Sequence, residues 1–162
     1  MNDKPTLLLQ ELKRIQPIHQ HGHKALSYLM DVLNKYDDFE VQKKVIVVLG
    51  EFGEAAKPSI PELMKKLNSR SKELRMVAAL SLAKIGTSSI PFLKEAMQKK
   101  KDDSSYWASI ALMLLHPEKV KDEEIDLLCQ VHRKTDCSFE RFAAEEVIGR
   151  VITFRMKQSN KE

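Results

Sequence analysis

The chain has 162 residues, of which 43% are hydrophobic and 31% charged, and a formal net charge of +4 at pH 7. This length suits one domain with its own core, and the composition excludes collagen-like, low-complexity and broadly disordered chains. No apolar stretch approaches the roughly 20 residues that cross a bilayer, and the first residues lack the pattern of a secretory signal. We therefore expect a cytoplasmic protein without a membrane partner. Its two cysteines are too few for a disulfide framework or a zinc set, so two free thiols are expected.

Amphipathic helices are predicted along almost the whole chain, because apolar residues recur at three- and four-residue spacing and strand-like alternation is absent. Glycine and proline interrupt this pattern at short intervals, for example at Gly53, Gly86 and Pro117. We expect a single domain over residues 1–157, with helix pairs at roughly 5–34, 39–68, 72–100 and 104–133, a terminal helix at 138–156 and a disordered tail at 158–162.

The chain contains an internal repeat of about 33 residues. Residues 41–53 align with residues 74–86 at a shift of 33, and the apolar positions and the terminal glycine both match. We call these segments A-type helices. Between them lies a second set, the B-type helices, in which residues 26–33 precede the matching residues 60–67 by 34. Such a period indicates a repeat architecture in which each helix pair buries its apolar face against its neighbours.

The ends of the repeated helices carry matching signals. Gly53 and Gly86 follow A-type helices at the position where a left-handed residue ends a helix. Ser59 and Ser89 each precede an Ile-Pro pair, which predicts a capping serine and a first-turn proline for the B-type helix. The predicted unit is therefore an A-type helix, a tight turn, a B-type helix and a loop.

The repeat resembles a known family, the short bacterial-type HEAT repeats, also called phycobilisome-lyase-like HEAT repeats. The resemblance rests on the motif Leu-Arg-x-x-Ala-Ala-x-x-Leu-x-x-Ile-Gly at 74–86, followed by Ile-Pro-x-Leu at 90–93. It implies an all-α, right-handed α-α superhelix of about four and a half HEAT-like helix pairs, similar to armadillo solenoids. Of the arginines that the family usually carries early in the A-type helix, only Arg75 is present here.

The resemblance also implies a binding surface, because the B-type helices of this family typically line the concave face. We therefore expect a non-enzymatic scaffold that binds another protein, one with an acidic surface, through B-helix positions not used for packing. These candidate partner-binding residues are Lys24, Tyr28, Asp31, Glu62, Lys65, Lys66, Phe92 and Lys94.

Positive charge is concentrated in residues 61–101, which hold 10 basic and 3 acidic side chains, a net charge of +7. One interpretation is a site for an anionic partner, either an acidic protein or nucleic acid. The other is a solvated face of helix ends and loops, since cations such as Lys99 suit the C-terminus of a helix. Nucleic-acid binding is the weaker alternative, because the segment lacks a set of aromatic residues on which bases could stack.

Catalytic and metal-binding motifs are sparse. The sequence has no Gly-rich phosphate loop, no Gly-x-Ser-x-Gly turn and no His-Glu-x-x-His helix, so we expect no catalytic residue, cofactor or metal. His19, His21 and His23 could surround one ion but also suit an ordinary polar turn. The resemblance leaves one enzymatic alternative, a subunit or relative of a HEAT-like enzyme of the bilin-lyase or DNA-glycosylase type. Trp107 falls on a packing position and is predicted to lie in the core.

The terminal helix departs from the repeat by continuing past its expected end. Val151, Ile152 and Phe154 either form the atypical outer face of the last repeat or a docking stripe for another chain.

Overall fold

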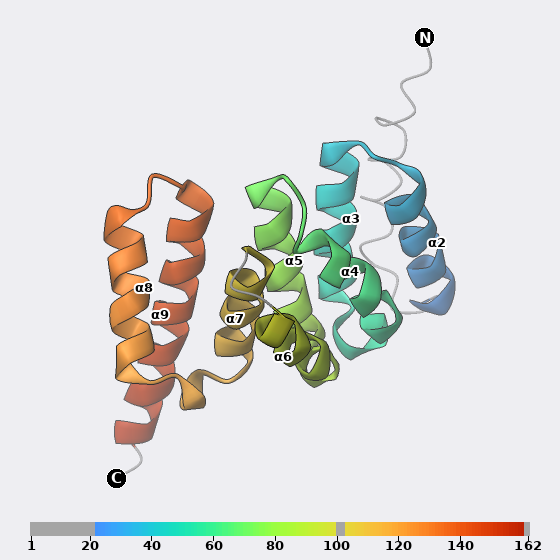
Figure 1. Ribbon diagram of the computed structural model, residues 1–162. Helices are drawn as coiled ribbons and strands as arrows, with labels where there is room; N and C mark the ends of the chain where they lie inside the picture. The colour runs from blue at the N-terminus through green and yellow to red at the C-terminus, as the bar shows by residue number, and fades with distance from the viewer. Residues whose placement is uncertain (1–21, 100–102, 161–162) are drawn as a thin grey trace.

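The computed structural model describes residues 22–99 and 103–160, and all the regular structure in this part of the chain is helical. Consecutive helices stack side by side in one curved row (Figure 1). The α-helices are α2 (Gly22–Lys35), α3 (Phe39–Glu51), α4 (Ile60–Lys66), α5 (Lys72–Ile85), α6 (Ile90–Lys99), α7 (Asp103–Leu115), α8 (Asp122–Lys134) and α9 (Ser138–Ser159); the 3-10 turns are η1 (Gly53–Ser59), η2 (Thr87–Ser89) and η3 (Pro117–Lys119).

Polar caps start the A-type helices α3 and α5. The Asp38 side chain accepts a hydrogen bond of 2.9 Å from the backbone N–H of Val41, and Ser71 accepts one of 3.3 Å from Leu74. Gly86 ends α5 with φ of 101°, a conformation that favours glycine, as the sequence predicts.

The serines before the B-type helices act differently from the prediction. Ser59 and Ser89 are buried, and both donate backwards to carbonyls of the preceding turn. Ser59 makes no side-chain capping bond to α4. The expectation that it caps this helix is therefore wrong, because the 3-10 turn before α4 offers its hydroxyl a nearer acceptor in Ala56.

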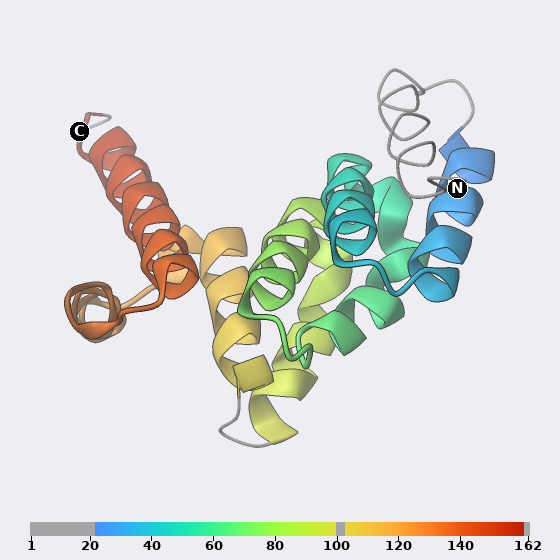
Figure 2. The same cartoon turned by 90° about the horizontal axis from the view of Figure 1, so that it is seen from above.

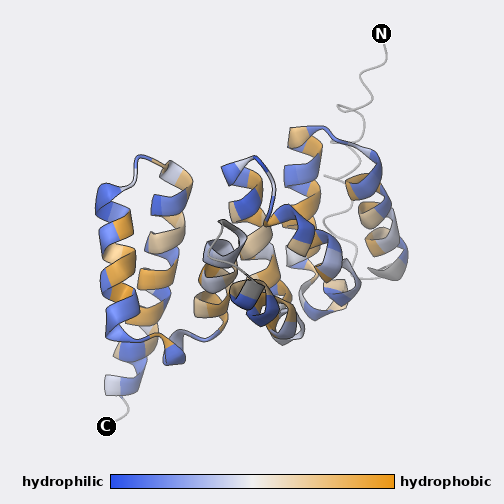
Figure 3. Ribbon diagram, viewed as in Figure 1, coloured by the Kyte–Doolittle hydropathy of each residue, from blue (hydrophilic) through white to orange (hydrophobic). Residues whose placement is uncertain are grey.

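One continuous hydrophobic core runs through the stack. The described helices carry both hydrophobic and hydrophilic residues along their length (Figure 3). Trp107 is 1% exposed, which confirms its predicted core position. Its ring meets Tyr106 edge to face, with the ring centroids 5.2 Å apart. The largest fully buried side chains are Trp107, Leu29, Ile46, Leu49, Ile60, Leu63, Leu67, Leu82, Ile85, Leu93, Ile110 and Val41.

Small residues bring α3 and α5 into close contact. A Cβ atom placed on Gly50 would lie 2.9 Å from the Ser81 Oγ, closer than real Cβ contacts allow. The Ser81 hydroxyl donates a 2.9 Å hydrogen bond to the Ile46 carbonyl, so this buried polar group has a hydrogen-bond partner within the helix contact. Ala78 and Ala79 of α5 are also fully buried.

The A-type helices line the inner side of the curve, which corrects the expected orientation of the solenoid. In sequence order α3, α5, α7 and α9 pack one against the next, and α9 also touches α5, whereas contact among the B-type helices is slight. Seen from above, the A-type helices surround the hollow of the curve, while α4 and α6 lie on its outer side (Figure 2). The A-type helices approach one another more closely than the B-type helices do, so the side of the stack that they form is shorter and becomes the concave one. The concave face is therefore the A-helix face and not the B-helix face.

The terminal helix is longer than predicted. It continues through Ser159, so the first two positions of the expected disordered tail, 158 and 159, are helical. No glycine or proline follows Gly149 to break the helix. Among the described helices, none is by itself long and apolar enough to span a membrane, and the pair formed by 72–85 and 87–98, which passes on length and composition only, is bent by 118°.

Candidate interaction surfaces

The predicted partner-binding residues are distributed over the three B-type helices α2, α4 and α6. Lys24, Tyr28 and Asp31 lie on α2, and Phe92 lies on α6. The three residues of α4 share a depression of about 280 Å³, whose lining also includes Phe39 of α3. Lys94 lines a different depression, of about 190 Å³, with Leu112 and Met113 of α7. The residues in question on α4 are Glu62, Lys65 and Lys66.

The two lysines of α4 are engaged within the chain. Lys65 forms an ion pair of 2.7 Å with Glu62 one turn away, and the Lys66 Nζ donates a 3.1 Å hydrogen bond to the side-chain oxygen of Gln42. The ion pair is largely exposed to solvent. Such a pair adds little stability, but it lowers the net positive charge that this part of the surface presents.

Several cations of the basic segment are engaged in contacts within the chain. Lys72 pairs with Glu140 of α9 at 3.1 Å, and Lys84 pairs with Glu51 of α3. The buried Arg75 donates a 2.7 Å hydrogen bond to the Ser69 carbonyl in the turn before its own helix. These contacts leave fewer cations of the segment available to an anionic partner. Lys100 and Lys101 lie outside the described residues.

The concave side of the stack carries a surface that the sequence analysis did not identify. We call it the A-helix groove. Its floor and walls come from four helices, and its volume is about 250 Å³. Val47 of α3 and Phe142 of α9 stand at its edges with exposed fractions of 41% and 44%. Its lining residues are Val47, Val77, Leu80, Ser81, Ala83, Lys84, Leu114, Phe142, Glu146 and Arg150.

Polar contacts fix the helices that form this groove. The Arg150 Nη1 of α9 donates a 2.9 Å hydrogen bond to the Leu114 carbonyl at the end of α7. Outside the groove lining, Lys43 of α3 forms a 3.0 Å ion pair with Glu73 of α5 and so joins two of the helices that form the groove. Hydrogen bonds to Glu40 and Glu73 raise the pKa of the Lys43 ammonium. The groove is therefore formed before any partner binds, which reduces the ordering cost of association.

Burial and hydrogen bonding act in opposite directions on Glu140, where α5 and α9 meet. Burial alone would raise the pKa of its carboxyl group, but hydrogen bonds from Thr135 and Lys72 outweigh this and hold the pKa below its ordinary value. The same contact with Glu140 raises the pKa of Lys72. Both groups therefore stay charged at neutral pH.

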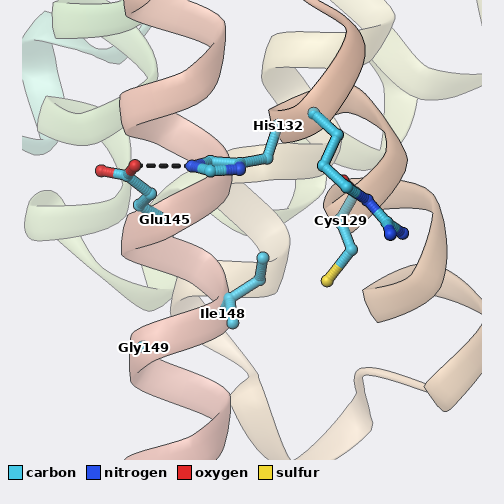
Figure 4. Close-up of a pocket in the computed structure, with 6 residues that line it drawn as sticks. Cys129, His132, Glu145, Ile148 and Gly149 are labelled. Carbon is cyan, nitrogen blue, oxygen red and sulfur yellow. Dashed lines mark hydrogen bonds and ion pairs between the residues drawn. The ribbon is translucent and has the colours of Figure 1, made fainter.

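A third depression, of about 580 Å³, lies between α8 and α9. The Nε2 atom of His132 lies 2.7 Å from the Glu145 Oε1, and the Cys129 sulfur points away from the imidazole (Figure 4). A cysteine nucleophile needs its base within hydrogen-bond reach of the sulfur, and this arrangement does not provide it. The depression is lined by Cys129, His132, Arg133, Glu145, Ile148 and Gly149.

The predicted histidine turn falls largely outside the part of the chain that the structure describes. His19 and His21 lie outside the described residues, as does the side chain of His23. Within residues 22–99 and 103–160, no group of three or more His, Cys, Asp or Glu side chains is arranged to hold a metal ion. Both cysteines are free thiols, as predicted.

Comparison with known proteins identifies the helix pairs. Residues 26–113, from α2 into α7, match the family model for HEAT repeats. Over 164 aligned residues the chain is 30% identical to the uncharacterized protein SkfG of Bacillus subtilis (strain 168), and the alignment covers 96% of this chain and 95% of that protein. No solved structure matches.

Proposed function

Because this chain belongs to the HEAT-repeat family, whose stacked helices create extended concave surfaces, we propose that it is a non-enzymatic scaffold that binds another protein in the A-helix groove. The observation that carries the proposal is the pair of exposed apolar side chains, Val47 and Phe142, at the edges of a groove built by four helices. The partner site thus moves from the B-type helices, where the family resemblance put it, to the A-type helices.

The chemistry of the groove favours a protein segment as its ligand. Apolar side chains of α5, including Leu80, form its floor, and charged groups stand at its margin. Binding energy at protein interfaces is concentrated in a few desolvated apolar anchors, while charges at the rim control the rate and specificity of association. An amphipathic helix of the partner could place its apolar face on Val47 and Phe142, as in other helix-in-groove complexes. Acidic residues of that helix would suit Arg150, which has no carboxylate partner within the described residues.

The charged groups in the groove support binding rather than catalysis. Lys84 is paired with Glu51, and Arg150 donates to a backbone carbonyl, so these groups do not converge on one point where a reacting atom could sit. Nucleic-acid binding is supported less well, because phosphate recognition depends on available cations, and Lys72 and Lys84 are used in contacts between repeats.

A capture experiment with matched variants tests this proposal. Immobilised protein would be exposed to lysate of the source organism with and without nuclease treatment, and the retained proteins would be compared for wild type, Val47→Asp and Phe92→Asp. Both substitutions add one negative charge at a half-exposed apolar side chain, one in the groove and one on α6. We expect Val47→Asp to lose a specific partner that wild type and Phe92→Asp retain. The reverse result would return the site to the B-type helices, and loss of all capture after nuclease treatment would indicate nucleic acid.

A further inference from the structure

Helices α8 and α9 form the C-terminal end of the stack (Figure 1). Val147 and Val151 point into the solenoid and are fully buried. Ile152 and Met156 lie on the opposite side, with exposed fractions of 50% and 62%. This corrects part of the predicted docking stripe: Val151 belongs to the core and Phe154 is half-buried, so only Ile152 of the three is available to another chain.

The exposed apolar residues of α9 are spaced for packing against a second helix. Phe142, Gly149 and Met156 are seven residues apart, and Ile152 lies three residues after Gly149. A seven-residue repeat of this kind keeps one face of a helix against a partner helix. Gly149 has open space where a Cβ would stand, and depressions of about 580 and 530 Å³ on the two sides of α9 both reach it. The surface of α9 is therefore recessed at Gly149, and a second helix can approach it closely there.

Charge is distributed unevenly along α9. Residues 138–148 contain Glu140, Glu145 and Glu146 against the single cation Arg141, whereas residues 149–159 contain three cations and no acidic residue. Contacts within the chain already engage four of these charges: Glu140 pairs with Lys72, Glu145 with His132 and Arg155 with Asp122, and Arg150 donates to the Leu114 carbonyl. Among the described residues no ion pair engages Glu146 or Lys157. The three cations are Arg150, Arg155 and Lys157.

We propose that α9 packs antiparallel against α9 of a second copy of this chain, around a two-fold axis near Gly149. The antiparallel arrangement brings the exposed Glu146 of each helix towards the basic half of the other, which carries Lys157, whereas a parallel arrangement would set like residues side by side. A two-fold interface uses the same residues on both copies, and a face that is self-complementary in charge satisfies this requirement. Ile152 and Met156 of both copies are buried in the contact.

The mass of the protein in solution tests the proposal. We expect sedimentation over a concentration series to reach a species of twice 18.6 kDa, and the double variant Ile152→Glu, Met156→Glu to remain monomeric. Leu127→Glu is the matched control, because Leu127 is also an exposed apolar residue, at 59%, but lies on α8. Phe142 belongs both to the A-helix groove and to the exposed face of α9, so it is not substituted in this test. The result therefore bears on the dimer alone and not on partner binding in the A-helix groove. A monomeric wild type, or a dimer that survives the double variant, would overturn the proposal.

Two further measurements keep the test independent of folding defects and define the orientation. Lys157→Glu changes a solvent-exposed end of α9 and should weaken dimerisation several-fold while leaving the circular dichroism spectrum unchanged. A spin label on Lys157→Cys, in a chain carrying Cys129→Ser and Cys137→Ser, should lie about 24 Å or more from its counterpart, the rise of sixteen helical residues. A separation near the roughly 10 Å between packed helices would indicate a parallel dimer and overturn the assignment.

Discussion

Lys72 and Glu140 form an ion pair of 3.1 Å between α5 and α9, although α7 lies between these helices in the packing order. The two residues are 68 positions apart, about two repeats. Thr135 donates a second hydrogen bond, of 2.7 Å, to the same carboxylate group. The contact joins the last helix to the middle of the stack on the concave side, and so supports the curvature that forms the A-helix groove.

This contact predicts a dependence of stability on pH. The folded-state pKa of Glu140 lies below its ordinary value of 4.5, so the unfolded chain binds a proton first as the pH falls. The stabilisation is therefore complete above about pH 4.5 and is lost as the pH falls through the folded-state value. Urea unfolding of wild type and Glu140→Gln should differ by about 0.2–1 kcal/mol at neutral pH, and the difference should shrink in acid. A difference that grows in acid would contradict the assigned contact.

The core prediction concerns Leu82, which is fully buried in α5. Leu82→Ala should lower the free energy of unfolding by about 2–5 kcal/mol, because it removes buried methyl groups and leaves a cavity. Denaturant unfolding measures the loss. Leu127→Ala, an equal truncation at an exposed position, should cost no more than about 0.5 kcal/mol. Equal losses at the two positions would show that the packing register is wrong.

Two glycines predict opposite effects of the same substitution. Gly50→Ala should destabilise the protein by about 1–3 kcal/mol, because the new Cβ would collide with Ser81 and force α3 and α5 apart. Gly149→Ala meets no atom within 4 Å and should stabilise α9 by about 0.5–1 kcal/mol through helix propensity. Thermal unfolding at a concentration where the protein is monomeric measures both. The same sign at both positions would contradict the close approach at Gly50.

Tyr106 predicts a neutral or stabilising substitution in the core. Its hydroxyl is buried without a hydrogen-bond partner among the described residues, and burial, followed by the nearby Glu140 and Cys137, raises its pKa to about 12. Tyr106→Phe removes the unpaired polar group and should change stability by between zero and about 1 kcal/mol in the favourable direction. It should also remove the last step of the alkaline absorbance titration. A loss above about 1 kcal/mol would indicate a partner for the hydroxyl.

The sequence alone predicts the repeat and its helices. A 33-residue period, apolar spacing and Gly86 after α5 predict the helix pairs, and the same pattern places Trp107 in the core, where it is found. These features are local or periodic, because each helix must bury one apolar face and end where its backbone can turn.

The side of the solenoid that forms the concave face was decided only by the tertiary structure. Both helix types are amphipathic, so the apolar pattern does not say which set approaches more closely. That depends on small residues that meet across helices, such as Gly50 and Ser81, and on charges two repeats apart, such as Lys72 and Glu140. Curvature follows from the distances between stacked helices, and these distances are a property of the packed side chains rather than of any one segment.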